Sequence, residues 1–397
     1  MRLAVLTTGR QDWGILRSTC VALRDGLPFE LCLIVGGMHC AEPFGRTEQL
    51  IIADGFQPAE RLDWIARAAT PHGQAGRAVE AVGDALERQR PDALLLVGDR
   101  FETAAAALAA TLERIPIVHL HGGEQTAGAF DDLLRNAVTK LSHLHLVSHL
   151  DYARRVIAMG EAPGTVHVVG APGLDNLHRA DLPGRAELER HLGIELTPPV
   201  VIVTLHPTTL ALPFEGEASS NGPEGPASAV DEVACVIGAM DRVAATYVVT
   251  LPNNDPGHEP FRQALVAAAR GERRVAVAAL GDRRFWGLMR IADAMLGNSS
   301  SALIEAPALG LPAVNVGDRQ SGRIRGANVI DVPTADVDAV ANALQRALAP
   351  ATRRSLAGAE SPFGDGRSTP RIIEILAGWT PPHPPRKAPV PIPQVTL

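Results

Sequence analysis

Acidic side chains cluster in one stretch of the chain, where two short apolar runs come to an end. The runs are residues 94–97 and 115–120, and glycine and carboxylates follow each of them. Carboxylates held together can act as general acids and bases, because burial and mutual repulsion raise the pKa values of some of them. The sequence therefore predicts an acid–base site, with these candidates: Asp99, Glu102, His119, His121, Glu124 and Asp131.

The alternative for each candidate is that it is a solvated loop residue that happens to follow a strand. As a set, however, they favour a site, because Gly122-Gly123 stands between two histidines and Glu124. Paired glycines at such a place indicate backbone that lies close to another group.

The elements that would position these residues alternate between apolar runs and helical spacing. From Leu94 to Lys140 the order is strand, loop, helix, strand, loop, helix. This order is typical of a parallel sheet with crossover helices. Ligands of such sheets bind beyond the carboxyl ends of the strands, where the candidates lie.

The rest of the chain predicts two α/β domains. The first, residues 1–178, opens with a strand at Leu3–Leu6, and the turn before a helix from Ile15 lacks the GxGxxG dinucleotide fingerprint. The second, residues 179–379, has its first strand at Val200.

Two further segments have the composition of disordered chain. Residues 211–228 are rich in Gly, Pro, Ser and Glu, which favours a flexible insertion. Residues 380–397 contain seven prolines, so they cannot form a helix and have little to bury. We expect a disordered, proline-rich tail.

A glycine- and serine-rich turn in the second domain predicts a phosphate-binding site. Residues 297–301 read Gly-Asn-Ser-Ser-Ser before a helix, where backbone N–H groups and hydroxyls can bind an anion. Glu305, one turn into that helix, could reach a ribose hydroxyl, and Arg319 follows the next strand. The alternatives are an ordinary serine cap, a solvated glutamate and an exposed arginine.

The totals limit the class of protein. A net charge of −7 excludes a general nucleic-acid binder, so an anionic ligand would need local arginines such as Arg10 and Arg319. The four cysteines form no CxxC pair, which favours buried thiols in a reducing compartment. No apolar run is long enough to cross a bilayer, and no signal peptide is visible, so we expect a soluble, cytoplasmic protein.

Ordered motifs from the first strand to about Gly366 resemble one known family. The chain is similar to the hydrolysing UDP-N-acetylglucosamine 2-epimerases of sialic-acid biosynthesis and to their relatives in legionaminic-acid pathways. The Gly-Gly-Glu segment is typical of the hydrolysing branch, because non-hydrolysing members have His-x-Glu-Ala-Gly-Leu-Arg there. The matching segments are residues 98–102, 119–124, 131–143, 170–173, 206–207, 253–255, 297–305 and 317–323.

The resemblance implies a GT-B type α/β fold, two Rossmann-like domains with parallel sheets facing across a cleft, in which the last helix can cross back to the first domain. It implies that a base removes the proton at carbon 2 of the sugar while UDP leaves carbon 1, and that water adds to the resulting glycal. By this analogy Asp99, Glu124 and Asp131 form the acid–base set, with His206 as a catalytic helper. No metal or cofactor is needed, and the protein would be a homodimer or homotetramer. The residues that would bind the nucleotide sugar are Arg10, Asn253, Ser299, Ser300, Glu305 and Arg319.

Several positions depart from the family pattern and leave the substrate open. Gln11, Trp13 and Asn136 stand where the family has alanine, tyrosine and histidine. UDP-N-acetylglucosamine is the first candidate, an NDP-linked 2,4-diacetamido-2,4,6-trideoxyhexose the second, and guanine could replace uracil. A GT-B glycosyltransferase and a catalytically inactive sugar-nucleotide sensor are the alternatives from other classes.

Overall fold

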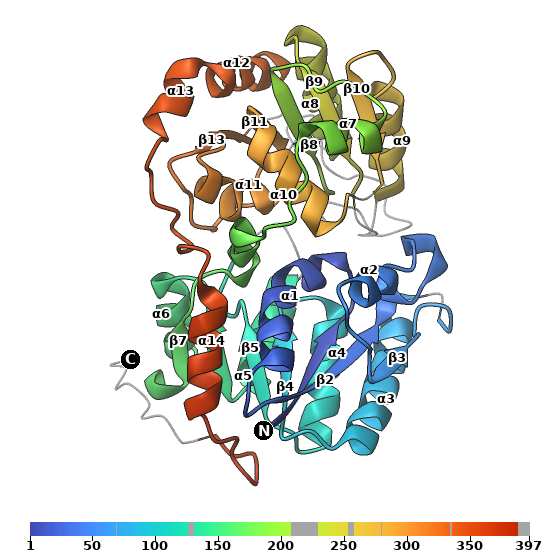
Figure 1. Ribbon diagram of the computed structural model, residues 1–397, viewed down its shortest axis with the longest axis vertical. Coiled ribbons are helices and arrows are strands. Elements are labelled where there is room, and N and C mark those ends of the chain that lie inside the picture. The colour runs from blue at the N-terminus through green and yellow to red at the C-terminus, as the bar shows by residue number, and fades with distance from the viewer. Residues whose placement is uncertain are drawn as a thin grey trace, which may run out of the picture. The chain divides into compact units, whose positions relative to one another are not determined.

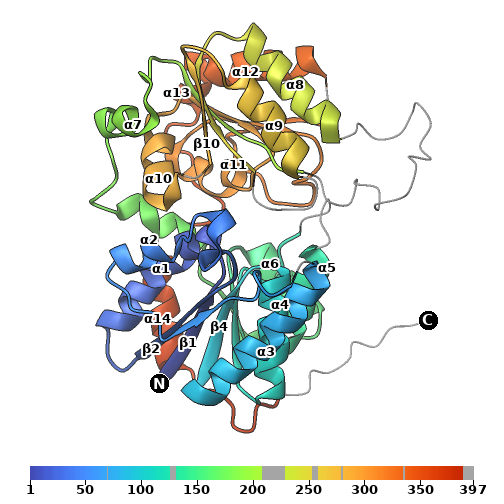
Figure 2. The ribbon, with the colours of Figure 1, turned by 90° about the vertical axis from the view of Figure 1, so that its right-hand side faces the viewer.

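The computed structural model describes residues 1–68, 70–125, 131–207, 229–252, 258–278, 280–333 and 336–387. The described chain forms two compact α/β units (Figures 1 and 2). Unit 1 consists of Met1–Glu124, Asp131–Asn176 and Phe363–Leu397, and unit 2 of Gln125–Phe130 and Leu177–Pro362. The predicted insertion at 211–228 lies outside the described residues.

Unit 1 is built on a parallel sheet of seven described strands in the order β3-β2-β1-β4-β5-β6-β7. Its central strands are runs of Leu, Val, Ile and Ala buried on both faces, which is the pattern of a sheet covered by helices on each side. The strands are β1 Arg2–Thr7, β2 Glu30–Gly36, β3 Glu60–Leu62, β4 Ala93–Val97, β5 Ile117–Leu120, β6 Leu144–Val147 and β7 Val166–Val168.

Helices cover both faces of this sheet, as Figure 2 shows. On one face α1 and α14 bury Leu16, Leu23, Ile372 and Leu376 against the strands. On the other face, α3 and α4 supply a core rich in alanine and leucine. The helices are α1 Arg10–Asp25, α2 Glu48–Ala53, α3 Pro71–Gln89, α4 Phe101–Leu112, α5 Asp131–Leu141, α6 Leu150–Ala158 and α14 Ser368–Gly378.

Unit 2 repeats the arrangement with six described strands in the order β10-β9-β8-β11-β12-β13, again parallel. Its strands are β8 Val200–Thr204, β9 Thr246–Thr250, β10 Arg274–Val277, β11 Ala294–Gly297, β12 Ala313–Val316 and β13 Val329–Val332. Its helices are α7 Arg185–Leu192, α8 Ala229–Arg242, α9 His258–Ala268, α10 Gly281–Ile291, α11 Ser301–Ile304, α12 Val337–Leu348 and α13 Pro350–Ser355.

The last helix, α14, belongs to unit 1 and not to the unit that precedes it in the chain. It packs against α1, and Figure 1 shows the two helices side by side. Asp175 fixes its start, because the carboxylate accepts hydrogen bonds from the Ser368 N–H (2.8 Å) and the Thr369 N–H (2.7 Å). These are N–H groups that the helix itself leaves without a partner.

The described part of the tail is anchored, although its proline content predicts disorder. Lys387 Nζ donates to the Lys140 carbonyl at 2.8 Å and lies 2.6 Å from the buried carboxylate of Glu161. Residues 388–397 lie outside the described residues. Among the helices that the structure describes, none is long and apolar enough to cross a membrane.

Candidate active site

Both sheets have a switch point, where the strand order reverses around the first strand of the unit. In unit 1 this point lies between β1 and β4, and in unit 2 between β8 and β11. Crevices at the carboxyl ends of such strand pairs are where open α/β sheets bind ligands. The residues that follow these four strands include most of those predicted from the sequence.

Asp99 follows β4 at the switch point of unit 1. Gly98 gives the chain its turn there with a positive φ of 75°, and its carbonyl lies 2.8 Å from His119 Nε2 on the next strand. The Asp99 carboxylate forms an ion pair with Arg135 and keeps 22% of its side-chain area exposed. Asp99 is therefore held in place and still open to solvent.

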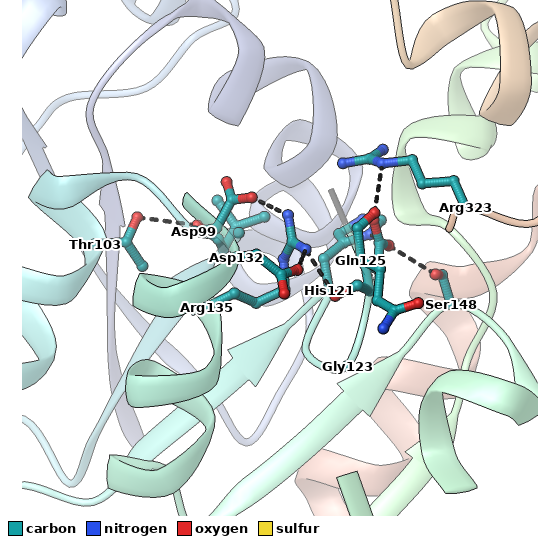
Figure 3. A network of polar contacts seen from close by, with 12 residues as sticks. Asp99, Thr103, His121, Gly123, Gln125, Asp132, Arg135, Ser148 and Arg323 are labelled. Carbon is teal, nitrogen blue, oxygen red and sulfur yellow. Dashed lines mark hydrogen bonds and ion pairs between the residues drawn. The ribbon is translucent and has the colours of Figure 1, made fainter. Parts of the chain in front are cut away.

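Arg135 joins several parts of this site. It lies on α5, its residue is 2% exposed, and it donates to Asp99, to Asp132 Oδ1 at 3.1 Å and to the Glu124 carbonyl at 2.7 Å. Figure 3 shows its guanidinium between Asp99 and the segment that carries His121. A buried guanidinium is stable only when such acceptors surround it. Asp131, the first residue of α5, lies one turn before Arg135.

Glu124 follows β5 and is 4% exposed. Its Oε1 accepts a hydrogen bond from Ser148 Oγ at 2.9 Å and lies 2.6 Å from His121 Nδ1. The sequence pointed to Glu124 but gave no partner for it, because Ser148 lies on a different strand end, after β6.

The two glycines before Glu124 are required by the packing of the loop. A Cβ on Gly122 would lie 3.0 Å from His119 Nδ1, and one on Gly123, whose φ is 77°, would lie 2.5 Å from the Tyr152 carbonyl oxygen. The group that this backbone approaches is therefore the protein's own scaffold of β5 and α6.

Further charged groups lie at the end of β1. Arg10 opens α1, where the sequence predicted a turn as far as Ile15, and burial lowers its pKa. Asp12 is 5% exposed and accepts hydrogen bonds from the Thr8 N–H (2.8 Å) and hydroxyl (2.6 Å). Burial raises the pKa of Asp12, although those hydrogen bonds and the positive charge of Arg100 act in the opposite direction. No acid–base role was predicted for Asp12, because one aspartate near a helix start is usually a cap.

Asn298 connects the two strand ends at the switch point of unit 2. Its side chain accepts from the His206 N–H at 2.8 Å and donates to the His206 carbonyl at 2.9 Å. Its own carbonyl accepts from Arg319 at 3.3 Å and from Gln320 Nε2 at 2.8 Å. His206, Asn298 and Arg319 are thus brought together, as a nucleotide site would require.

The serine-rich turn has the backbone geometry of a tight approach. A Cβ on Gly297, whose φ is 136°, would lie 2.0 Å from the Thr204 carbonyl oxygen, so only glycine fits there. Ser299 is buried and its hydroxyl accepts from the Ser301 N–H at 3.3 Å, while Ser300 is half-buried and precedes α11. The helix predicted to continue past Glu305 is wrong, because Glu305 separates the short helix α11 from a 3₁₀ turn at Ala306–Leu309.

Glu232 on α8 is a carboxylate that the sequence did not single out. It is 5% exposed, and a Cβ on Gly317 would meet its Oε1 at 2.3 Å. Asn298 Nδ2 lies 3.4 Å from its other oxygen. Burial and the charge of Asp318 raise the pKa of Glu232 to about 7. Nothing near it in the sequence marks it, because its partners follow two distant strands.

Comparison with known proteins decides the family. The family model for UDP-N-acetylglucosamine 2-epimerase matches residues 22–377. This chain belongs to the UDP-N-acetylglucosamine 2-epimerase family.

Individual members are similar over most of their length. A polysialic acid biosynthesis protein P7 of Escherichia coli is 32% identical over 336 residues, which cover 84% of this chain and 82% of that protein. A hydrolysing UDP-N,N'-diacetylbacillosamine 2-epimerase of Legionella pneumophila is 32% identical over 382 residues, 95% of this chain and 96% of that protein. A UDP-GlcNAc 2-epimerase from Neisseria meningitidis, solved with UDP-GlcNAc bound, has a TM-score of 0.77 at 17% identity and covers 95% of this chain and 100% of that one.

The epimerase family places the fold in the GT-B class, with two Rossmann-like parallel α/β units, as the sequence predicted. Among the residues predicted to bind substrate, Asn253 lies outside the described residues. In the part of the chain that is described, no group of three His, Cys, Asp or Glu side chains could hold a metal ion.

Proposed function

We propose that this epimerase is of the hydrolysing type and converts a UDP-2-acetamido sugar to UDP and the free 2-epimer. UDP-N-acetylglucosamine is the foremost substrate, which makes N-acetylmannosamine the product. The observation that carries the proposal is the buried network at the switch point of unit 1, where Arg135 contacts Asp99 and the Glu124 carbonyl while Glu124 contacts His121. Such a network supplies the proton-transfer groups that an elimination needs.

The reaction proceeds in two steps. In the first, a base takes the proton from carbon 2, the C–H electron pair becomes the C1–C2 double bond, and UDP leaves with the C1–O electron pair. In the second, water adds at carbon 1 of this glycal and a proton returns to the opposite face of carbon 2. Asp99, Glu124 and Asp131 form the acid–base set of unit 1, and His206 assists.

Unit 2 holds the nucleotide in this proposal. A leaving diphosphate is stabilised by N–H donors and positive charge, which the turn at Ser299 and Ser300 and the guanidinium of Arg319 can supply. Glu305 suits a ribose hydroxyl, and Asn253 and Arg10 complete the predicted set. We further propose that the protein is cytoplasmic and acts as a homodimer or homotetramer.

A second substrate is favoured by a specific observation. The Legionella pneumophila relative, which is hydrolysing and acts on UDP-N,N'-diacetylbacillosamine, is similar over 95% of this chain. An NDP-linked 2,4-diacetamido-2,4,6-trideoxyhexose, on the route to legionaminic acid, is therefore the competing substrate to UDP-N-acetylglucosamine.

The test is a panel of nucleotide sugars incubated with the protein in heavy water, with UDP release and the sugar product both followed by NMR. We expect UDP together with a free sugar that is inverted at carbon 2 and carries deuterium there. A UDP-linked 2-epimer without UDP release would indicate a non-hydrolysing epimerase. Release of UDP with neither inversion nor label would indicate hydrolysis or glycosyl transfer, and binding without turnover a sensor.

A further inference from the structure

His121 has a backbone conformation that histidine rarely adopts. Its φ is 64°, in the left-handed region where a side chain is strained. The surrounding loop is closely packed. The His121 N–H donates to the Leu146 carbonyl at 3.1 Å, and a Cβ on the nearby Gly123 would lie 2.5 Å from the Tyr152 carbonyl oxygen. Strain that the structure maintains in this way is typical of functional sites.

The side chain of His121 is oriented by a carboxylate. The residue is 7% exposed, and its Nδ1 lies 2.6 Å from Glu124 Oε1. An ionised carboxylate only accepts hydrogen bonds, so in the neutral imidazole Nδ1 carries the proton and Nε2 presents a lone pair. Among the described residues, this buried Nε2 has no hydrogen-bond partner. The lone pair of Nε2 is therefore available to accept a proton.

The neighbouring carboxylates are already engaged by other groups. Glu124 Oε1 accepts from Ser148 Oγ in addition to its contact with His121, and Asp99 is paired with Arg135. A carboxylate that receives such donors serves best to hold its partner in one tautomer and orientation.

We propose that His121 exchanges a proton with carbon 2 of the sugar, and that Glu124 and Ser148 are its positioning residues. In the elimination step Nε2 takes the proton, the C–H electron pair forms the C1–C2 double bond, and UDP departs with the C1–O pair. The Glu124 carboxylate stabilises the imidazolium that results. Inversion requires a proton to return to carbon 2 on the opposite face of the sugar, so a group other than His121 donates that proton. This inference rests on the proposed function and sharpens it: within the acid–base set, Glu124 acts by holding and charge-balancing His121, and His121 transfers the proton.

The positive φ of His121 provides a test in which folding is preserved. Glycine adopts left-handed backbone readily, so His121→Gly relieves strain while it removes the imidazole. We expect UDP release to fall about 100-fold or more, the scale of a lost general base, and added imidazole to restore part of it. His121→Asn, which also tolerates this φ, should be equally slow and should not respond to imidazole.

A matched control separates backbone effects from chemistry. Arg90 ends α3 with a φ of 47° and is exposed, so Arg90→Gly relieves similar strain away from the site. It should keep full activity and should not respond to imidazole. Calorimetric binding of UDP to the His121 variants confirms that they are folded.

A pH profile separates the role of Glu124 from that of His121. The groups around the imidazole are Glu124, His119 and, through the Glu124 carbonyl, Arg135. His119 stays neutral, because burial lowers its pKa to about 3. Loss of the Glu124 charge disfavours the imidazolium, so in Glu124→Gln the acidic limb of kcat/KM should move to lower pH. In His121→Asn that limb should vanish.

The outcomes distinguish this inference from the proposed function. If the wild type labels carbon 2 with deuterium and His121→Asn does so at the wild-type rate, the inference is wrong and the proposed function stands. The inference would also be wrong if two results came together: imidazole fails to restore the activity of His121→Gly, and Glu124→Gln leaves the acidic limb of the kcat/KM profile at the wild-type pH. If the wild type gives no label, the proposed function fails and the inference with it.

Discussion

The switch points of the two sheets have the same strand topology and opposite chemistry. In unit 1 the residues beyond β1 and β4 include buried charges, with Arg135 contacting Asp99 and the Glu124 carbonyl. In unit 2 the residues beyond β8 and β11 are mainly amide, hydroxyl and backbone groups, centred on Asn298 and Ser299.

This difference suggests that proton transfer and nucleotide binding are divided between the two units. Burying a charge is costly unless partners surround it, so a fold retains such groups where proton transfer needs them. A site that only holds an anionic nucleotide can use neutral N–H and hydroxyl donors, which are cheaper to bury. In our proposal, the same scaffold therefore serves chemistry in one unit and binding in the other.

The largest effects should follow from removing the charges of unit 1. We expect Asp99→Asn and Glu124→Gln each to lower turnover by about 100-fold or more, the scale of a lost acid–base group. UDP affinity, measured by calorimetry, should stay near that of the wild type. The double variant should be little worse than the worse single variant, because groups that act as one unit are not additive. Normal turnover of Glu124→Gln would contradict the acid–base role of the Gly-Gly-Glu segment and favour a glycosyltransferase.

The buried carboxylate of unit 2 should affect stability instead of catalysis. Because burial and Asp318 raise the pKa of Glu232 from 4.5 to about 7, the folded state keeps a proton that the unfolded chain releases. The stabilisation that this proton gives the folded state is complete below pH 4.5 and is lost as the pH rises to about 7. The loss lowers the free energy of unfolding by up to about 3 kcal/mol. Glu232→Gln should therefore flatten the dependence of Tm on pH in that window and raise Tm at pH 8.

The control for this experiment is Glu374→Gln, at an exposed position on α14. It should leave the slope of Tm against pH unchanged. An unchanged slope in Glu232→Gln would mean that Glu232 stays ionised, and that buried charge is common to both switch points.

Loss of Arg319 should weaken nucleotide binding more than it slows the chemistry. A charge-assisted hydrogen bond to a phosphate is worth about 1.5–3 kcal/mol, so Arg319→Ala should raise the Kd for UDP about 10- to 150-fold. Turnover at saturating substrate should fall less than in Asp99→Asn or Glu124→Gln, because Arg319 stabilises the leaving diphosphate but transfers no proton. Arg346→Ala, an exposed arginine on α12, is the matched control. Equal UDP affinity in both variants would contradict the role of unit 2 in holding the nucleotide.

Much of this fold could be predicted because its strands are apolar runs and its loops carry glycine. The central strands of both units and the turns at Asp99 and Ser299 follow from that pattern alone. The short edge strand β3 was not predicted, because Glu-Arg-Leu has no apolar run. Strand β13 and helix α12 were also not predicted.

The site could be predicted only one residue at a time. Asp99 and Glu124 stand out by position, but their partners Arg135 and Ser148 come from other elements. Periodicity does not say which side chains meet across a sheet edge. The left-handed backbone of His121 has no sequence signal either, since histidine is not a residue that marks a turn.

The smallest effect concerns the tail of unit 1, which contacts a buried carboxylate that has no role in the proposed chemistry. Glu161 is 1% exposed and contacts His145 at 3.1 Å, Lys140 at 2.6 Å and Lys387 at 2.6 Å. Burial alone would raise the pKa of Glu161, but these partners outweigh it and lower the pKa to about 2. The paired carboxylate therefore stabilises the fold above pH 4.5, and this contribution is lost as the pH falls toward 2.

Lys387→Ala should lower the free energy of unfolding by about 1 kcal/mol at pH 7, because Glu161 keeps its other two partners. The deficit should shrink as the pH falls from 4.5 toward 2, since protonated Glu161 no longer attracts the ammonium group. A chain that ends at Lys387 should melt like the full-length protein, whereas one that ends at Thr380 should lose at least as much stability as Lys387→Ala. Equal melting temperatures for both truncations would show that the tail adds nothing, as its seven prolines alone suggest.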